Sequence, residues 1–316
     1  MPRGRTTTAT RPGWRRVVGG TVLGGAAFGA SCLAYAHFIE LTDFRLRRFT
    51  ARLLPPGAAP LRILHVSDIH LLPSQLKKQH WIAELAALEP DLVVSTGDSL
   101  SSDTALAVLE SSLGPLLDKP GVFVFGSNDY VRPVMKNPAD YVVKGPSSYK
   151  VEERAQLATE ELRHRFLHRG WVDLNNHAAT LEVAGHRIEF RGTDDPHIGR
   201  DEYASLAGPA DPTADLHVGV THAPYARVLD AMTADGMDLL LAGHTHGGQV
   251  CLPVKGALVT NCDLDTARAK GLSSHSASGR TAALHVSAGL GTSPFAPYRF
   301  FCPPEATLLT VLPRQT

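Results

Sequence analysis

The eleven residues from Leu239 to Gln249, LLLAGHTHGGQ, constrain this chain more than any other stretch. The apolar start predicts a buried strand, and the glycines predict a tight turn directly after it. His244 and His246 stand two positions apart, so in a strand they would point to opposite faces. In a glycine-flanked turn both imidazoles can instead point into one cavity and offer neutral nitrogens to a divalent metal. We therefore expect a metal-binding turn at the end of this strand.

Polar side chains also follow four other predicted strands. These strands cover residues 61–66, 92–95, 122–125 and 216–220, and they lead into Asp68-x-His70, Gly97-Asp98, Asn128-Asp129 and His222. Helical patterns over 75–88 and 104–117 separate the first three strands, which gives the β-α-β-α-β order of an open α/β sheet. Such sheets place their sites at the carboxyl ends of the strands. We predict that these side chains share one pocket with the two histidines.

This set combines carboxylates, imidazoles and an amide oxygen, which suit Mn²⁺, Fe or Zn²⁺ better than Ca²⁺. The candidate metal ligands are Asp68, His70, Asp98, Asn128, His222, His244 and His246. They are too many for one tetrahedral ion, but they suit two ions that share a bridging carboxylate about 3.5–4 Å apart. A mononuclear zinc hydrolase is a competing hypothesis, and the number of ions bound per chain separates the two.

The remainder of the chain predicts a second sheet. Short strands are expected over 171–174, 180–183 and 187–191 with hairpin connections, and closing strands over 284–287 and 306–311. A charged helix over 152–169 and another over 223–235 complete an α/β domain that we place at residues 61–316. Residues 39–60 are interpreted as a linker and edge strand, because this stretch turns polar and then rich in proline, glycine and alanine.

The N-terminus has the pattern of an export or anchor segment. Residues 1–16 form a tail that carries arginines and no acid, and residues 17–38 lack charged side chains over a length that can cross a bilayer. We predict a transmembrane or signal-anchor helix over 17–38, with the catalytic domain outside the cytoplasmic membrane. A cleaved signal peptide, which would export the domain, and a lipoprotein signal ending at Cys32 are the alternatives.

Composition narrows the function classes further. The chain has 31 basic and 31 acidic residues, so no overall field recruits nucleic acid, and we expect no nucleic-acid partner. The four cysteines form no Cys-x-x-Cys pair, which argues against a zinc ribbon or a thioredoxin-type motif. Buried free thiols are favoured over a Cys251–Cys262 disulfide. The oligomeric state is not predicted.

Taken together and in this order, the motifs resemble those of the calcineurin-like metallophosphoesterase superfamily, from about Leu61 to Val311. Gly192-Thr193-Asp194-Asp195-Pro196, Pro303-Pro304-Glu305 and the N-terminal apolar segment resemble its membrane-anchored bacterial branch. That branch includes cell-wall-associated phosphoesterases and enzymes similar to UDP-diacylglucosamine pyrophosphohydrolase. The implied fold is a four-layer α/β/β/α sandwich of two mixed sheets flanked by helices and preceded by the N-terminal helix.

The resemblance also implies how the ligands divide. It assigns Asp68, His70 and His246 to one ion, assigns Asn128, His222 and His244 to the other, and makes Asp98 the bridge. The implied cofactors are two divalent ions (Mn²⁺, Fe²⁺/Fe³⁺ or Zn²⁺), and Asp98, Asn128 and His222 have the catalytic roles. A bridging hydroxide would then attack the phosphorus of a phosphodiester, phosphomonoester or pyrophosphate. A lipid-linked substrate is one option, given the N-terminal segment.

One position departs from the family pattern. Where the family has Gly-Asn-His-Asp, this chain has Gly126-Ser127-Asn128-Asp129. We expect Asn128 to supply the metal oxygen, because a neutral serine hydroxyl is a poor substitute. The histidine that assists the leaving group is missing, so the chain is expected either to use another proton donor or to prefer good leaving groups. A catalytically weak metal-binding or scaffold protein is the alternative.

Three further side chains are candidates for substrate contact. Asp194 and Asp195 lie in the extra motif shared with the membrane-anchored branch, and Arg132 lies in the loop after Asn128. The two carboxylates also fit roles in a turn or in supporting a metal ligand. Arg132 fits a contact with a substrate phosphate.

Overall fold

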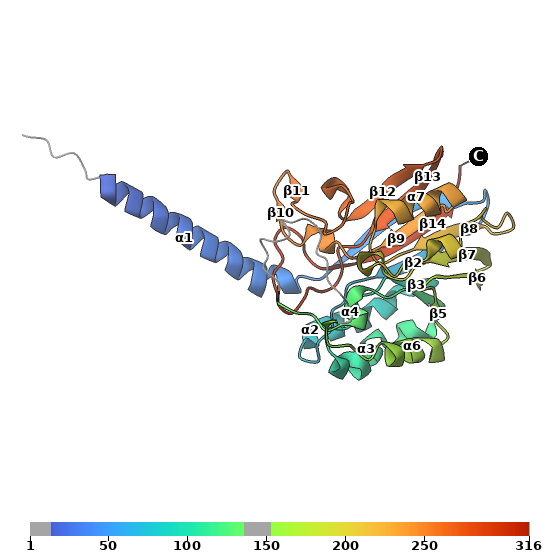
Figure 1. Ribbon diagram of the computed structural model, residues 1–316, viewed down its shortest axis with the longest axis horizontal. Helices are drawn as coiled ribbons and strands as arrows, with labels where there is room; N and C mark the ends of the chain where they lie inside the picture. Colours follow the sequence, from blue (N-terminus) through green and yellow to red (C-terminus); the bar gives the residue numbers. More distant parts are fainter. Residues whose placement is uncertain (1–13, 136–152, 316) are drawn as a thin grey trace, which may run out of the picture.

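The computed structural model describes residues 14–135 and 153–315, and the side chains from residue 25 onward. Two six-stranded mixed sheets form the body of the molecule (Figure 1). The first sheet has the order β1 (Arg45–Leu54), β14 (Glu305–Pro313), β2 (Leu61–Val66), β3 (Leu92–Ser95), β4 (Gly121–Phe123) and β5 (Val172–Asp173). Strands β2 to β5 run parallel, and β14 pairs antiparallel with β2 and parallel with β1.

The second sheet contains the strand that opens the metal-binding turn. Its order is β12 (Gly271–Ala277), β13 (Arg280–Val286), β9 (Leu239–Ala242), β8 (Leu216–Val220), β7 (His186–Gly192) and β6 (His177–Val183). The inner strands β7, β8, β9 and β13 are parallel, and each outer strand pairs antiparallel with its neighbour. A small hairpin, β10 (Cys251–Leu252) and β11 (Gly256–Ala257), follows β9.

Helices cover the outer faces of both sheets. On the first sheet lie α2 (Leu76–Glu84), α3 (Leu106–Leu113) and α6 (Thr159–His168), and on the second lies α7 (Ala226–Asp235). The short helix α4 (Ser127–Tyr130) follows β4 at the edge where the site forms. The order of layers is therefore helices, sheet, sheet, helix, as the resemblance implied.

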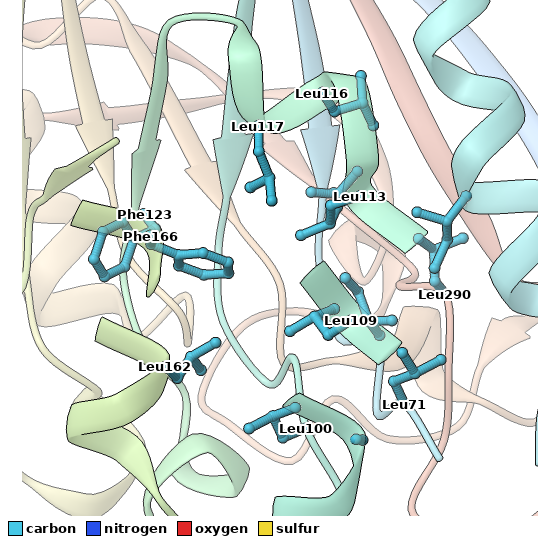
Figure 2. Close-up of a cluster of buried hydrophobic side chains, with 14 of the residues drawn as sticks. Leu71, Leu100, Leu109, Leu113, Leu116, Leu117, Phe123, Leu162, Phe166 and Leu290 are labelled. Carbon is cyan, nitrogen blue, oxygen red and sulfur yellow. The ribbon is translucent and has the colours of Figure 1, made fainter. Parts of the chain in front are cut away.

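Side-chain alternation explains this layering. In β2, Ile63 joins the core between the sheets, whereas Leu64 faces the helices. In β9, Leu239 and Leu241 enter the core between the sheets, whereas Leu240 packs with α7. Because side chains of a strand alternate between faces, an unbroken apolar run is needed where both faces are covered. Figure 2 shows the helix-side core, in which Leu109 and Leu113 of α3 lie among other leucines and Phe166 of α6.

The two outer strands β1 and β12 are the hardest to recognise in the sequence. Strand β1 spans ten residues of the segment interpreted as a linker and edge strand, and it pairs with β14 at the edge of the first sheet. Strand β12 was not predicted at all. Both are outer strands with mostly exposed or half-buried side chains, and they lack the apolar alternation that marks a half-buried strand.

The N-terminal helix α1 (Trp14–Phe38) forms and extends away from the sheets (Figure 1). Among the described residues, no helix has both the length and the apolar character needed to cross a bilayer. The predicted transmembrane span over 17–38 is therefore not supported, because much of this helix is glycine and alanine. All four cysteines are free thiols, in line with the sequence-based interpretation.

Candidate metal centre

The predicted ligands lie in loops that leave adjacent strand ends of the two sheets. Asp68 follows β2, Asp98 follows β3, His222 follows β8, and His244 follows β9. Backbone hydrogen bonds tie the loops within each sheet together, from Asp68 N to Gly97 O (2.9 Å) and from Gly243 N to His222 O (2.8 Å). The loops of each sheet are therefore held together at the edge formed by the carboxyl ends of its strands.

Five of these residues have an uncommon backbone conformation. Their φ angles are positive, in the left-handed region that side chains with a Cβ rarely adopt: Asp68 48°, His70 45°, Asp98 54°, His244 68° and His246 49°. Each such residue costs about 1–3 kcal/mol and persists only where the surrounding structure enforces it. Such clustering of strained residues at one edge is typical of a functional site.

One group of donors contains Asp68, His70, Asp98 and His246. One ligand atom from each of the four lies within 4.8 Å of the others. His70 Nε2 is 3.3 Å from His246 Nε2 and 3.4 Å from Asp98 Oδ2. His246 Nε2 is 3.4 Å from Asp68 Oδ1. All four side chains are buried or nearly so, and this spacing suits a cation held between them.

A second group lies on the other side of Asp98. His222 Nε2 is 3.3 Å from His244 Nδ1 and 3.7 Å from Asp98 Oδ2. Asp98 Oδ2 therefore stands between the two groups, within 4 Å of an imidazole nitrogen in each. This is the position that a carboxylate shared by two ions would occupy.

Backbone carbonyls determine which imidazole nitrogens carry hydrogen. His222 Nδ1 faces Thr96 O at 2.6 Å, His244 Nε2 faces Asn261 O at 3.1 Å, and His246 Nδ1 faces Gly291 O at 2.9 Å. A carbonyl can only accept, so each of these nitrogens is the donor. In neutral His222 and His244 the opposite nitrogens then carry lone pairs and face each other, and the lone pair of neutral His246 faces His70 Nε2. Nitrogens arranged in this way beside two carboxylates suit a cation.

The electrostatics point the same way. Burial lowers the pKa of His70 to about 4 and lowers those of His244 and His246 well below the usual value, so these rings are neutral at pH 7. Burial also disfavours a charged His222, but nearby carboxylates, Asp98 foremost, raise its pKa to about 9. Without a cation, a proton on His222 therefore compensates the buried carboxylates. A metal ion would replace that proton.

Asp98 is held as an anion at the centre of the site. Burial opposes its ionisation, but His222, His70 and two hydrogen bonds from Asn128 outweigh that cost and lower its pKa to about 2. Asn128 donates its backbone N–H to Asp98 Oδ1 (2.7 Å) and its amide Nδ2 to Asp98 Oδ2 (2.6 Å). The structure therefore brings the Asn128 amide to the bridging carboxylate, while Ser127 is buried and also lines the cavity.

Close packing explains the residue types beside the ligands. A Cβ at Gly126 would collide with Asp98 Oδ1 and would lie 2.7 Å from His222 Nδ1. Asp129, fully buried, accepts hydrogen bonds from the backbone N–H groups of Asp98 (2.7 Å) and Gly126 (3.0 Å). It joins the loops after β3 and β4, which explains an acidic residue at this position of the motif.

The three residues expected to contact substrate do not line the cavity beside the ligands. Arg132 pairs with Asp103 at 2.7 Å. Asp194 accepts a hydrogen bond from the Tyr130 hydroxyl (2.7 Å) and pairs with Arg200 at 2.9 Å. Asp195 is fully buried and accepts the backbone N–H of His197, and its charge helps to raise the pKa of His222. Asp194 and Arg132 are therefore paired with other side chains, and the charge of Asp195 acts on His222.

His197 and Arg299 were missed by the sequence analysis. The His197 ring lies against that of His244, with 4.3 Å between ring centroids, and lines the cavity. It directly follows the Asp194-Asp195-Pro196 motif, which is the signal that could have found it. Arg299 is fully buried and donates to the backbone oxygens of Ala288 (2.6 Å) and Gly291 (2.7 Å), so it shapes the loop that holds His246. Its sequence context gives no such signal.

Five of the seven candidate ligands line a cavity of about 320 Å³, whereas Asp68 and His222 are not among its lining residues. His70, Asp98, Asn128, His197, His244 and His246 lie on its lining. Donors that could hold metal are thus reachable by a small substrate.

Comparison with known proteins identifies the family of this chain. The family model described as calcineurin-like phosphoesterase matches residues 61–248, which contain every ligand named above. The chain is 26% identical to the phosphodiesterase YaeI of Escherichia coli over 290 residues, covering 90% of this chain and 94% of that protein. It is 27% identical to the metallophosphoesterase YkuE of Bacillus subtilis over 307 residues, covering 92% of each.

Other similarities cover less or are weaker. YpbG of Bacillus subtilis is 28% identical over 196 residues, which is 61% of this chain and 64% of that protein. A 5'-nucleotidase precursor from Thermus thermophilus aligns with a TM-score of 0.42 at 13% identity, over 80% of this chain and 55% of that one. Since the family model spans more than half of the chain, the protein belongs to the calcineurin-like phosphoesterase family.

Proposed function

We propose that the protein is a phosphoesterase that uses two divalent ions to hydrolyse a phosphodiester or pyrophosphate bond. The observation that carries the proposal is the pair of imidazole contacts, one between His70 and His246 and one between His222 and His244, joined by the Asp98 carboxylate. When neutral, these imidazoles can direct lone pairs at ions bound around the Asp98 carboxylate. This set suits cations, and the family membership makes phosphoester hydrolysis the chemistry to expect from them.

The roles of the residues follow from the two groups. Asp68, His70 and His246 would hold one ion, and His222, His244 and the amide oxygen of Asn128, after rotation of that amide, would hold the other. Asp98 would serve both. When bound, two such ions acidify water and neutralise charge on phosphoryl oxygens. The chain itself keeps the ligand set rigid through the carbonyl contacts of the three histidines.

The leaving group is where this chain differs from the usual family pattern. No histidine stands at Asn128, so the usual assistance to the departing oxygen is absent. Esters of acidic alcohols and pyrophosphates need little protonation, and we propose that these are preferred over phosphomonoesters of ordinary alcohols. The name of YaeI, a phosphodiesterase, is consistent with this choice. A location at the cytoplasmic membrane stays a prediction from the N-terminal sequence.

The test combines metal analysis with turnover. The full chain, stripped with a chelator and then titrated with Mn²⁺, is assayed on bis-p-nitrophenyl phosphate and p-nitrophenyl phosphate. Two ions per chain and hydrolysis of the diester, which has a good leaving group, are expected. One ion per chain would favour a mononuclear hydrolase instead. Two ions without turnover of either ester would favour the scaffold alternative, which the missing histidine makes worth testing.

A further inference from the structure

A series of hydrogen-bonded side chains leads from Asp68 into the core between the two sheets. Ser67 Oγ donates to Asp68 Oδ2 (2.5 Å), and Thr96 Oγ1 donates to Ser67 Oγ (2.7 Å). Thr96 Oγ1 also lies 2.9 Å from His65 Nε2, and His65 Nδ1 lies 2.9 Å from His285 Nδ1. All five residues are fully buried. We call Ser67, Thr96, His65 and His285 the buried polar series.

The two histidines occupy positions where the strands otherwise place apolar side chains. His65 follows Leu61 and Ile63 on the face of β2 that packs between the sheets, and His285 follows Ala283 on the corresponding face of β13. Burying a polar ring costs free energy unless it finds hydrogen-bond partners, and an apolar side chain would avoid that cost. The pair therefore indicates a role beyond filling the core.

The hydrogen bonds of the series have one consistent direction. A carboxylate that binds a metal is ionised and can only accept, so the Ser67 hydroxyl uses its one hydrogen toward Asp68. Ser67 then accepts from Thr96, and Thr96 accepts from His65 Nε2. In a neutral His65 ring, Nδ1 is therefore the acceptor and takes the hydrogen of His285 Nδ1. Every donor in the series points toward Asp68.

The far end of the series agrees with this direction. It leaves His285 Nε2 as a lone pair, and that nitrogen is buried without a hydrogen-bond partner in the described part of the chain. Burial lowers the pKa of His285 to about 4 and lowers that of His65 well below its usual value, so both rings are neutral at pH 7. Because the series ends inside the core, it is suited to orienting Asp68 rather than to carrying protons to solvent.

The two oxygens of Asp68 have different surroundings. Oδ2 accepts from Ser67, and the His244 N–H lies closer to Oδ2 (3.0 Å) than to Oδ1 (3.2 Å). Oδ1 faces His246 Nε2 at 3.4 Å. A Cβ at Gly243 would collide with both Ser67 Oγ and Asp68 Oδ2, so this packing requires glycine before His244. The series thus determines which oxygen of Asp68 is turned toward an ion.

We propose that His65 and His285 are positioning residues for the metal ligand Asp68. They act through the buried polar series and keep the Ser67 hydroxyl on Oδ2, so that Oδ1 stays turned toward the ion that His246 also binds. The inference rests on the two-ion site of the proposed function, but it does not require that the site hydrolyse a phosphoester.

The first test reads the direction of the series without metal or turnover. In the full chain with ¹⁵N-labelled histidine, nitrogen chemical shifts at about pH 8, where carboxylates are ionised, show which nitrogen of each ring carries hydrogen. We expect hydrogen on Nε2 of His65 and on Nδ1 of His285. The signals that disappear in His65→Gln and in His285→Asn assign the two rings. Hydrogen on Nδ1 of His65, or a charged ring in the pair, would overturn the inference.

The second test measures the affinity for Mn²⁺ by calorimetry. The double variant His65→Leu with His285→Leu removes both polar partners together, so neither ring leaves an unpaired N–H in the core. One of the two ions should bind about tenfold more weakly, the lower end of the loss seen when a group that supports a metal ligand is removed. His65→Gln, whose Nε2 can still donate to Thr96, should restore most of that affinity.

Thr96→Val interrupts the series beside Ser67 and should weaken the same ion about tenfold. It keeps the shape of the side chain, so it decides the question if the double variant is unstable. Two matched controls are buried residues outside the series, His186→Leu at the start of β7 and Thr233→Val in α7, where the Thr233 hydroxyl has no partner among the described residues. Both controls should bind Mn²⁺ as the wild type does.

The outcomes separate this inference from the proposed function. Wild-type affinity for both ions in the folded double variant, or in Thr96→Val, would show that the histidines only fill the core and would overturn the inference. Selective weakening of one ion in a chain that hydrolyses neither ester would refute the phosphoesterase proposal and leave the positioning role standing.

Discussion

Replacing Asp98 by asparagine should remove both metal ions and the activity. The substitution keeps the size of the side chain and an oxygen that can accept from the Asn128 N–H, so it tests the charge alone. Asp98 is ionised at neutral pH, and its Oδ2 lies 3.4 Å from His70 Nε2 and 3.7 Å from His222 Nε2. The negative charge therefore stands next to both donor groups.

The size of the effect follows from these distances. A unit charge 4 Å from another contributes about 4 kcal/mol at the effective dielectric of about 20 that describes protein sites. Each divalent ion has twice that charge, and desolvation offsets part of the gain. We therefore expect each ion to lose about 4 kcal/mol of binding free energy when the charge of Asp98 is removed, which weakens its binding about 10³-fold. Turnover should fall by at least as much, because the chemistry needs both ions.

Elemental analysis after equilibration with micromolar Mn²⁺ measures the metal, and bis-p-nitrophenyl phosphate measures turnover. Asp230→Asn is the matched control, because Asp230 is a half-exposed carboxylate that contacts His275 on the far side of the second sheet. The fold of Asp98→Asn should survive, since Asp129 holds this loop through backbone N–H groups. Two ions per chain and wild-type turnover in Asp98→Asn would refute the bridging role.

Three further predictions follow from the same structure. Gly126→Ala should lower activity at least about 10²-fold with unchanged circular dichroism, because the new methyl group would displace Asp98 and His222; wild-type kinetics would contradict this packing. Chelation should lower the Tm, since at 100 times its Kd a bound ion stabilises by about 2.7 kcal/mol; a Tm indifferent to EDTA and Mn²⁺ would argue against a metal site. His217 has a raised pKa because it hydrogen-bonds Asp238 (2.7 Å). The His217–Asp238 pair therefore contributes up to ~1 kcal/mol to the free energy of unfolding. This contribution is fully present below the unfolded-state pKa of His217, about 6.5, and is lost as the pH rises through the folded-state pKa. The free energy of unfolding of His217→Asn, measured by urea denaturation, should be lower than that of the wild type at pH 5.5 and approach it at high pH. A difference between the two that grows with pH would contradict this prediction.

The strands that build the site could be recognised from the sequence because both of their faces are buried. Leu61–Val66, Leu92–Ser95, Leu216–Val220 and Leu239–Ala242 are observed with the predicted bounds or within one residue of them. The outer strands were harder to recognise from the sequence. Strand β1 mixes arginines and apolar residues without a regular alternation, and β12 is rich in serine, so neither carries the alternating pattern that marks a half-buried strand.

The sequence by itself determined which side chains could bind metal, since the residue types and their places after apolar strands are local properties. It could not show that His222, His244 and His246 each donate to a backbone carbonyl from another loop, and so aim their lone pairs inward. Nor could it show that Asp194 and Arg132 are already paired elsewhere. Contacts between residues distant in the chain depend on how the two sheets pack, and no local pattern encodes that packing.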